Sequence, residues 1–296
     1  MSVYDKNGDQ IEALYDAVSA IRRAYDVDGN IVYDTTYDTY TISTIYTLGV
    51  NNCQGMAVYD NVLFQFRASG SAITDKVSLF TYSTGAPILT DMSCKADHGD
   101  SATFSNEFYS ESDEFPLLYV TADTTPAIIY VDQISRSSSS LARTLKFPAS
   151  AGYYGAGAFD FQNNICWLLA YSRNNYQTDD SGANKTVVSK WDLSTLAANG
   201  DGTYTPAFIS QYERDFIYVM QGLAYHDGVI WISSGYPSHN AYVYGMDPET
   251  GIIEHTIDFN TTTEIEACQF IYDNAAQDWY MLAGFQGGLY KKVTFN

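Results

Sequence analysis

A strand-and-turn motif recurs five times along the chain, and this repeat constrains the fold more than any other feature. The copies read GMAVYDN, DSATFSN, AGAFDFQNN, GLAYHDG and CQFIYDN, with aromatic residues at Tyr59, Phe104, Phe161, Tyr225 and Tyr272. Each turn carries Asn, Asp or Gly, the residues that tolerate the positive φ angles of a tight hairpin. Repeats at intervals of roughly 40–50 residues are typical of sheets that stack side by side, in a ring or in an array.

Each motif is followed by a second and a third apolar strand, and four of the five repeats also have a fourth. The last repeat has no fourth strand before the final residue, but residues 39–48 have strand character and precede the first repeat. We expect this segment to complete the last sheet of a domain that spans residues 37–296. The sequence therefore predicts an all-β fold, a five-bladed β-propeller with a short N-terminal helical arm. An elongated array of β-sandwiches is the alternative.

Residues 1–36 have a different pattern and predict the separate N-terminal arm. Between residues 11 and 25, apolar side chains recur at alternating spacings of three and four residues, as in a short helix with a heptad seam. The seam consists of Ile11, Leu14, Val18, Ile21 and Tyr25. Such a helix can pack on the propeller or associate with copies of itself. We expect self-association, as a homotrimer.

Two turns and four cysteines carry side chains of the kinds that bind metal ions. The turns YDKNGDQI and YDVDGNIV resemble the start of a calcium loop, but neither has the Glu that an EF-hand carries at its twelfth position. Cysteines 53, 94, 166 and 268 lie far apart, without the ligand spacing of a zinc site. We therefore expect buried thiols, no bound metal and no cofactor.

The charge balance argues against several partners. The chain has 35 Asp and Glu residues against 15 Lys and Arg, a net charge of -20. Nucleic acid is not expected, because neutralising phosphates requires clustered basic residues. An anionic membrane surface is disfavoured for the same reason. No apolar window of about 18 residues could span a bilayer, and the polar start MSVYDKNGDQ is not a secretory signal.

The segments that lead into the five first strands are predicted to meet at one mouth of the propeller. They place Gln54, His98, Tyr154, Gln221 and Glu266 around the axis, with Asp100 beside them. Loops between second and third strands would form the wall, with Tyr171, Arg173, Tyr176, Tyr236 and His239. Aromatic rings can stack on sugar rings, and amides can hydrogen-bond hydroxyl groups. The pattern favours glycan binding; the alternative is that the polar residues only satisfy backbone groups near the axis.

Catalysis has less support in the sequence. His98 lies between Asp97 and Asp100, and a carboxylate-oriented His can act as a general base. No Ser or Cys nucleophile with a motif accompanies it. A glycosidase needs facing carboxylates, for which Asp100, Glu264 and Glu266 are the evident candidates. We therefore expect a protein that is not an enzyme.

The stretches QGMAVYDNVLFQF and DHGDSATF resemble the five-bladed propeller of receptor-binding proteins on the tails of phages that infect Gram-positive bacteria. The turns around the heptad stretch are similar to the start of phage tail and fibre proteins. The resemblance implies a virion protein of the tail or a surface fibre, extracellular on host contact. It also implies trimerisation, attachment to other virion proteins through the arm, and binding of a host surface glycan or cell-wall polymer through the propeller face.

A further stretch, QGLAYHDGVIWISSG followed by YVYGMDPETGII, is similar to one blade of the plant-type glutaminyl cyclases, which are also five-bladed propellers. The matching residues are Gln221, Gly222, Leu223, Ser234, Gly235, Asp247 and Gly251. This resemblance implies an enzyme, although the other repeats lack the Glu-Gly pattern expected around that family's site. A third possibility is a virion decoration or scaffold protein without a ligand. Of the three, we favour the receptor-binding protein.

Overall fold

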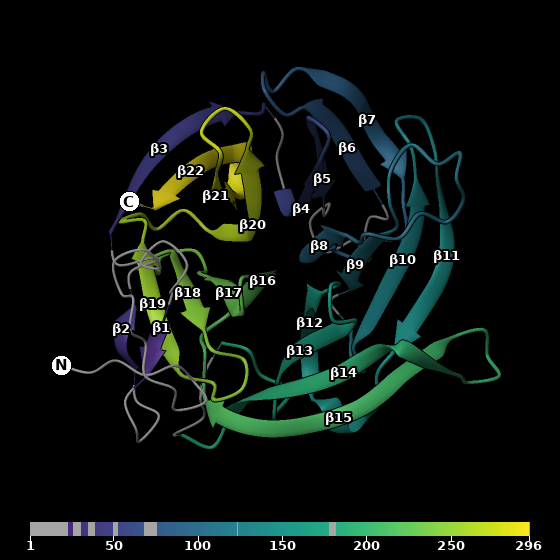
Figure 1. Ribbon diagram of the computed structural model, residues 1–296, viewed down its shortest axis with the longest axis vertical. Coiled ribbons are helices and arrows are strands. Elements are labelled where there is room, and N and C mark those ends of the chain that lie inside the picture. The colour runs from purple at the N-terminus through teal and green to yellow at the C-terminus, as the bar shows by residue number, and fades with distance from the viewer. Residues whose placement is uncertain are drawn as a thin grey trace, which may run out of the picture. The chain divides into compact units, whose positions relative to one another are not determined.

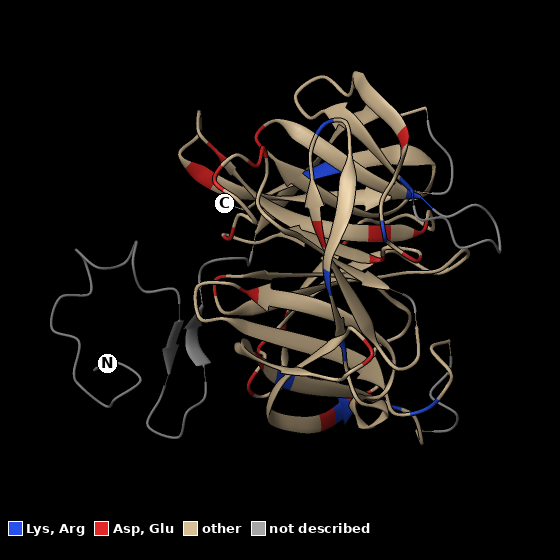
Figure 2. Ribbon diagram, turned by 90° about the vertical axis from the view of Figure 1, so that its right-hand side faces the viewer, with Lys and Arg blue, Asp and Glu red and all other residues tan. Residues whose placement is uncertain are grey.

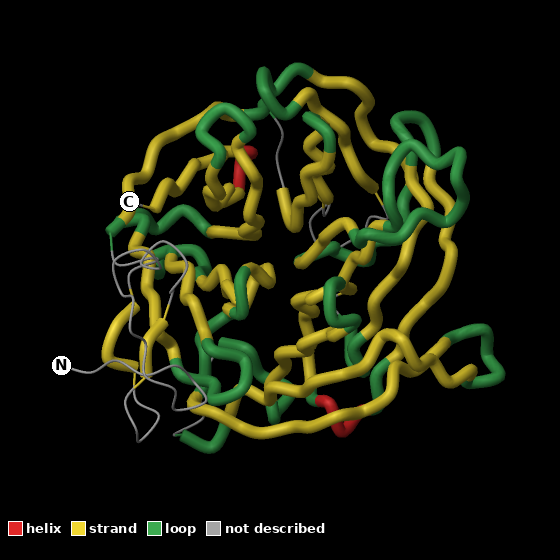
Figure 3. Tube along the Cα trace, viewed as in Figure 1, coloured by secondary structure: helices red, strands yellow, loops and turns green. Residues whose placement is uncertain are grey.

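The computed structural model describes residues 23–25, 31–34, 39–49, 53–67, 76–122, 124–177 and 182–295. The chain divides into two compact units, one of Met1–Ile42 with Val293–Asn296 and one of Ser43–Lys292. Strands dominate both, so the protein is all-β as predicted (Figure 1). The helical segments within the described ranges are two 3-10 turns, η1 (Ala149–Ala151) and η2 (Gln286–Gly288), drawn red in Figure 3. None of the helices described in those ranges has the length and apolar character needed to cross a membrane.

The smaller unit contains a two-stranded antiparallel hairpin of β1 (Arg23–Tyr25) and β2 (Ile31–Asp34). The predicted helix is therefore wrong for its last three residues, including Tyr25. The reason is local, because the sequence between the strands contains Asp28 followed by Gly29, a pair that hairpin turns prefer. The other seam residues, Ile11, Leu14, Val18 and Ile21, lie outside the described residues, so their helix and their self-association stay predictions.

The described part of the larger unit contains four sheets, three of which are four-stranded. The first consists of β4 (Cys53–Tyr59), β5 (Val62–Arg67), β6 (Lys76–Thr81) and β7 (Pro87–Ser93), in that order. The second consists of β16 (Met220–His226), β17 (Val229–Ser234), β18 (Tyr242–Met246) and β19 (Ile253–Asp258). The third has the order β20 (Ile265–Asp273), β21 (Asp278–Phe285), β22 (Leu289–Phe295) and β3 (Tyr40–Thr47).

The fourth sheet has eight strands, because two antiparallel runs join edge to edge. One run is β8 (Ser101–Phe104), β9 (Leu118–Ala122), β10 (Ile128–Ile134) and β11 (Ser139–Lys146). The other is β12 (Tyr153–Asp160), β13 (Ile165–Tyr171), β14 (Lys185–Ala198) and β15 (Tyr204–Asp215). The runs meet where Leu145 of β11 pairs in parallel with Tyr204 of β15. The long β14–β15 hairpin makes this junction possible, since its tip reaches the neighbouring run.

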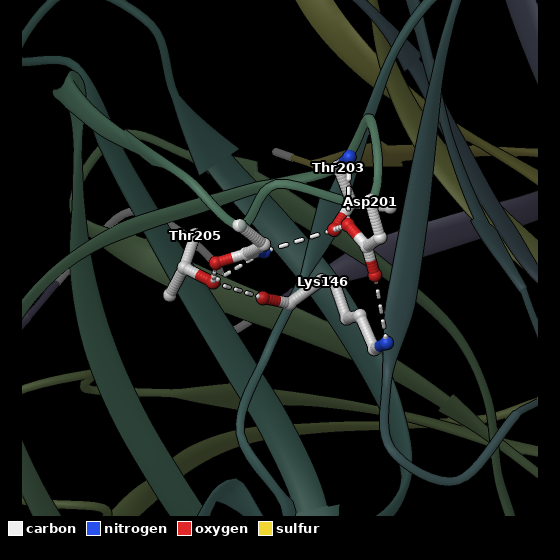
Figure 4. Close-up of polar contacts among 5 residues, drawn as sticks. Lys146, Asp201, Thr203 and Thr205 are labelled. Atoms are coloured by element: carbon white, nitrogen blue, oxygen red, sulfur yellow. Dashed lines mark hydrogen bonds and ion pairs between the residues drawn. The ribbon is translucent and has the colours of Figure 1, made fainter.

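Polar side chains hold the tip of that hairpin against β11 (Figure 4). The Thr205 hydroxyl donates to the backbone carbonyl of Lys146 at 2.8 Å, and the Lys146 ammonium lies 3.4 Å from the Asp201 carboxylate. The Thr203 hydroxyl and backbone N–H donate to Asp201 at 2.6 and 3.0 Å. These donors, with the Thr203 side chain acting most strongly, lower the pKa of Asp201 to about 2.

The sheets of the larger unit are arranged around one axis, as in a β-propeller (Figure 1). Strands β4, β8, β12, β16 and β20 lie nearest the centre of that view, and each is in contact with others of the set. Strands β7, β11, β15 and β19 lie towards the rim. In each four-stranded sheet, and in each run of the eight-stranded sheet, the first strand thus lies at the axis and the fourth lies at the outside.

Buried apolar clusters lie between neighbouring sheets, so each sheet needs its neighbours to bury its faces. One cluster lies between the first sheet and the β8–β11 run, and a second lies between that run and the β12–β15 run. A third lies between the β12–β15 run and the second sheet. A fourth lies between the third sheet and the first. Representative residues that share a cluster are Phe64 with Phe104, Leu145 with Phe159, Trp167 with Ile230, and Met56 with Leu282.

The innermost strands approach so closely that two positions require glycine. A Cβ on Gly55 of β4 would lie 1.8 Å from the carbonyl oxygen of Gly99, and one on Gly222 of β16 would lie 2.8 Å from that of Glu266. Ser101 links the same region, because its hydroxyl lies 3.0 Å from the Gly157 carbonyl oxygen and 2.9 Å from that of Leu223. The two Gln-Gly repeats are therefore explained by close packing at the axis.

Candidate functional site

The segments that lead into the innermost strands bring five polar residues together at one end of the axis. We call this set the axial cluster: His98, Asp100, Gln221, Glu264 and Glu266. The His98 Nδ1 lies 3.2 Å from Asp100 Oδ1, and the Gln221 amide donates to Glu264 Oε1 at 2.6 Å. Four of the five were predicted at a mouth or beside it, and Glu264 was named among possible carboxylates. The cluster draws on three different sheets, so it depends on the complete larger unit.

The backbone before β8 is bent tightly to deliver His98 and Asp100. Asp97, His98 and Gly99 have consecutive positive φ angles of 46°, 84° and 75°. Two of these residues are not glycine, so the segment holds a conformation that costs free energy on its own. The surroundings stabilise it, because Gly55 and Gly222 leave room for the carbonyl oxygens of Gly99 and Asp100. The close packing of the axis thus fixes the position of Asp100.

Glu266 is the most buried member of the axial cluster, with 2% of its surface exposed. Burial raises its pKa well above the ordinary value, and the neighbouring Glu264 and Asp100 carboxylates raise it further; a hydrogen bond with the Gln286 side chain acts in the opposite direction. Its Oε1 atom has no hydrogen-bond partner among the described residues. The environment of Glu266 therefore favours its neutral, protonated form.

Glu264 is half-buried and behaves differently. Burial raises its pKa, whereas the charge of His98 and the hydrogen bond from Gln221 lower it. His98 and Gln221 thus favour the ionised form of Glu264, whereas the neighbouring carboxyl groups of Glu264 and Asp100 favour the neutral form of Glu266.

An aromatic group lies beside Glu264. The Tyr218 and His239 rings are 4.6 Å apart, and the Tyr218 hydroxyl is 3.1 Å from His239 Nδ1. Burial raises the pKa of Tyr218, and so do the nearby Tyr236 and Glu264. His239 and Tyr236 were predicted in the wall, whereas Tyr218 was not. Its signal in the sequence is an aromatic residue just before the second Gln-Gly pair.

The loop after β13 was predicted to form the rest of the wall. Tyr154 and Tyr176 form a T-shaped pair with ring centroids 5.2 Å apart. The backbone N–H of Val219 donates to the Tyr176 carbonyl oxygen at 3.2 Å, so this loop adjoins the segment that carries Tyr218. Arg173 is exposed, and its backbone N–H donates to the Asn184 side chain at 3.2 Å.

Two predicted ligand residues are buried instead. Tyr171 is 1% exposed, and its hydroxyl accepts a hydrogen bond of 2.7 Å from the backbone N–H of Met220. It therefore anchors the start of β16 and offers no ring face to a ligand. Gln54 is 8% exposed, and its backbone carbonyl accepts a hydrogen bond from the Gln65 side chain at 3.1 Å. The contacts of these two residues are therefore with the backbone and side chains of the inner strands, and neither side chain is exposed to a ligand.

Within the described ranges, no set of three or more His, Cys, Asp and Glu residues has an arrangement that could hold a metal ion. The cysteines at positions 53, 94, 166 and 268 are buried and unbridged. Burial raises the pKa of Cys53 to about 12 and that of Cys268 to about 12, so neither is a thiolate at neutral pH.

Comparisons with known proteins identify no family for the chain. No protein-family model matches the chain. No curated protein matches it either. Among solved structures, the glutaminyl cyclase of Myxococcus xanthus is similar at 12% sequence identity and a TM-score of 0.49, over 87% of this chain and 96% of that one. A likeness at this level does not transfer an activity, so the prediction that the protein is not an enzyme stays a prediction.

Proposed function

We propose that this protein is a five-bladed β-propeller that binds a surface glycan at its axial cluster. The observation that carries the proposal is the convergence of His98, Asp100, Gln221, Glu264 and Glu266 where apolar residues would pack more simply. Carboxylates accept hydrogen bonds, and the amide and the neutral acid also donate them, which suits sugar hydroxyl groups. Tyr218, whose pKa Glu264 and Tyr236 affect, and His239, whose ring lies 4.6 Å from that of Tyr218, supply faces for a sugar ring.

The blade count rests on the sheet order. Three blades are the four-stranded sheets, and the two runs of the eight-stranded sheet supply the other two. In this arrangement β14 and β15 form a long outer hairpin of one blade, and its tip pairs with β11 of the neighbouring blade.

The biological setting that we propose is a phage virion. The repeats and the N-terminal turns resemble those of tail receptor-binding and fibre proteins, and the arm before residue 37 is the segment that would attach to other virion proteins. Self-association of the arm as a homotrimer would present three axial clusters on one particle. Weak affinity for one sugar would then become strong attachment to a host surface.

A binding experiment on host cell walls and a glycan array tests the proposed site. The double variant Tyr218→Ala, Tyr236→Ala removes two rings beside Glu264 and should lose most glycan binding, because each ring contact contributes about 0.5–1.5 kcal/mol. The control is Tyr109→Ala, which removes a tyrosine that is 60% exposed in a loop between β8 and β9. Unchanged binding by the folded double variant would exclude this site.

The Glu264–Glu266 pair also favours a second candidate function, acid–base catalysis. A neutral acid beside an ionised carboxylate is the arrangement that enzymes use to donate and accept protons in one site. A cyclase of N-terminal glutamine would use it while the α-amine attacks the side-chain amide carbon and ammonia leaves. Incubation with a peptide that begins with Gln tests this function: ammonia release that is lost in Glu266→Gln would support it, and absence of release by the wild type would exclude it.

A further inference from the structure

We propose that the axial cluster selects glycans that carry a primary ammonium group, such as amino sugars, over the same glycans in N-acetylated form. The inference rests on the glycan-binding function proposed above and names the chemistry of its ligand. It follows from the charges that face the cluster and from one buried oxygen atom without a partner.

The charges around the axial cluster are predominantly negative. Asp100, Glu264 and Glu266 supply three carboxyl groups, and the His98 Nδ1 lies 3.2 Å from Asp100 Oδ1. Arg67, the last residue of β5, is bound to Asp91 at 2.7 Å. The chain has 35 Asp and Glu residues against 15 Lys and Arg. Figure 2 shows both kinds spread over the sheets and turns. An anionic polymer would therefore be repelled, whereas a cation would be attracted.

The ionised form of Glu266 would need a hydrogen-bond donor. Its Oε1 is buried without a hydrogen bond among the described residues, while the Gln286 side chain bonds to the same carboxyl group. A buried acceptor left unsatisfied is unfavourable. An ammonium group carries three donors and a positive charge, so it can bond to Glu266 and to the neighbouring Glu264 together. An N-acetylated nitrogen has one donor and no charge.

Binding of a cation should release a proton from Glu266. The pKa of Glu266 is raised by burial and by Glu264 and Asp100. His98 acts on Glu264, and burial raises the pKa of the Cys53 thiol on β4 to about 12. An ammonium group beside the carboxyl favours its ionised form. Affinity for the amine should therefore increase as the pH rises, until the amine itself loses its proton.

Two tetrasaccharides with the same rings and linkages test the inference: a glucosamine tetramer and an N-acetylglucosamine tetramer. Calorimetry at neutral pH should show at least tenfold tighter binding of the glucosamine tetramer. Measured in two buffers of different ionisation enthalpy, that binding should also release protons. The variant Glu266→Gln keeps the shape of the neutral acid and should lose both the preference and the proton release.

The control is Glu249→Gln, the same substitution at an exposed site, 2.6 Å from Lys190. It should bind both tetramers as the wild type does. Equal or tighter binding of the N-acetylated tetramer by the wild type would overturn the ammonium inference and leave glycan binding intact. If the wild type binds neither tetramer nor any glycan on the array, both proposals are wrong. Retention of the preference by Glu266→Gln would exclude Glu266 as its source.

Discussion

The side-chain amide nitrogen of Gln221 lies 2.6 Å from the Glu264 carboxylate, and this hydrogen bond joins β16 to the residue just before β20. The same nitrogen lies 3.3 Å from the Gly235 carbonyl oxygen, so the amide is held between two acceptors. Gln221 thereby fixes the Glu264 side chain at the end of the axis and favours its ionised form. The glutamines of the two Gln-Gly pairs therefore differ: Gln221 belongs to the axial cluster, whereas Gln54 is buried.

Replacing Gln221 by Met should raise the pKa of Glu264, because a donor to the carboxylate is lost while its burial remains. The protein should also lose about 1 kcal/mol of unfolding free energy with this hydrogen bond. An NMR titration of the Glu264 carboxyl carbon measures the first effect and urea unfolding the second. Gln277→Met, at an exposed turn where the amide bonds to the Asn274 carbonyl oxygen, is the matched control. An unchanged Glu264 titration would show that the bond does not set its charge.

Replacing Gly55 by Ala should destabilise the larger unit severely, by more than about 4 kcal/mol. The added Cβ would lie 1.8 Å from the Gly99 carbonyl oxygen, and both partners are backbone atoms that cannot rotate away. The control is Gly49→Ala, where a Cβ meets nothing within 4 Å, and its effect should stay within about 0.5 kcal/mol. Urea denaturation compares the two, and equal midpoints would contradict the close approach of β4 to the β8 segment.

The larger unit should also depend on the strand that neighbours β22. Within this unit the Leu48 backbone N–H donates to the Gly288 carbonyl oxygen at 2.8 Å, and the Tyr46 ring packs 5.5 Å from that of Tyr290. Deleting residues 1–48 removes these contacts and leaves β22 as an exposed edge, which can pair with other molecules. We expect aggregation or oligomers in analytical ultracentrifugation. Deletion of residues 1–22 keeps β3 and is the control; a monodisperse 1–48 deletion with unchanged thermal stability would contradict the role of β3.

Local turn sequences allowed the strands to be predicted, because short hairpins are set by neighbouring residues. Asp60 and Asn61 have φ angles of 42° and 59°, as the motif GMAVYDN requires of its turn, and Asp227 has 56° in the fourth copy. The joining of two runs at Leu145 and Tyr204 was not predicted. That contact links segments far apart in sequence, and no local pattern encodes it.

The candidate site was predicted in part for a similar reason. The repeat aligned His98, Gln221 and Glu266 at equivalent strand starts, so their convergence followed from the ring. Successive side chains of a strand point in opposite directions, so a shift of one residue decides whether a side chain faces solvent or the core. Tyr171 was predicted to face a ligand, but its side chain lies in the core. Tyr218 was missed because the segment before β16 has no counterpart in the other copies.

The last prediction concerns stability against pH and uses Glu266→Gln. In the unfolded chain the pKa of a Glu is about 4.3, whereas the pKa of Glu266 in the folded protein lies well above its ordinary value. Between these two values the folded state binds a proton that the unfolded state has released. The contribution of this residue to the unfolding free energy is therefore fully present below the unfolded pKa and is lost as the pH rises towards the folded pKa, by up to about 1.4 kcal/mol per pH unit.

Glutamine has no proton to lose, so the variant should gain stability relative to the wild type as the pH rises from 5 to 7. Urea unfolding at three pH values measures the difference, and subtraction of the two proteins cancels the other ionisable groups. Glu249→Gln, the same substitution at an exposed site, is the control. Parallel curves for Glu266→Gln and wild type would mean that Glu266 is already ionised in the folded protein. The neutral acid on which the proton-release experiment depends would then be absent.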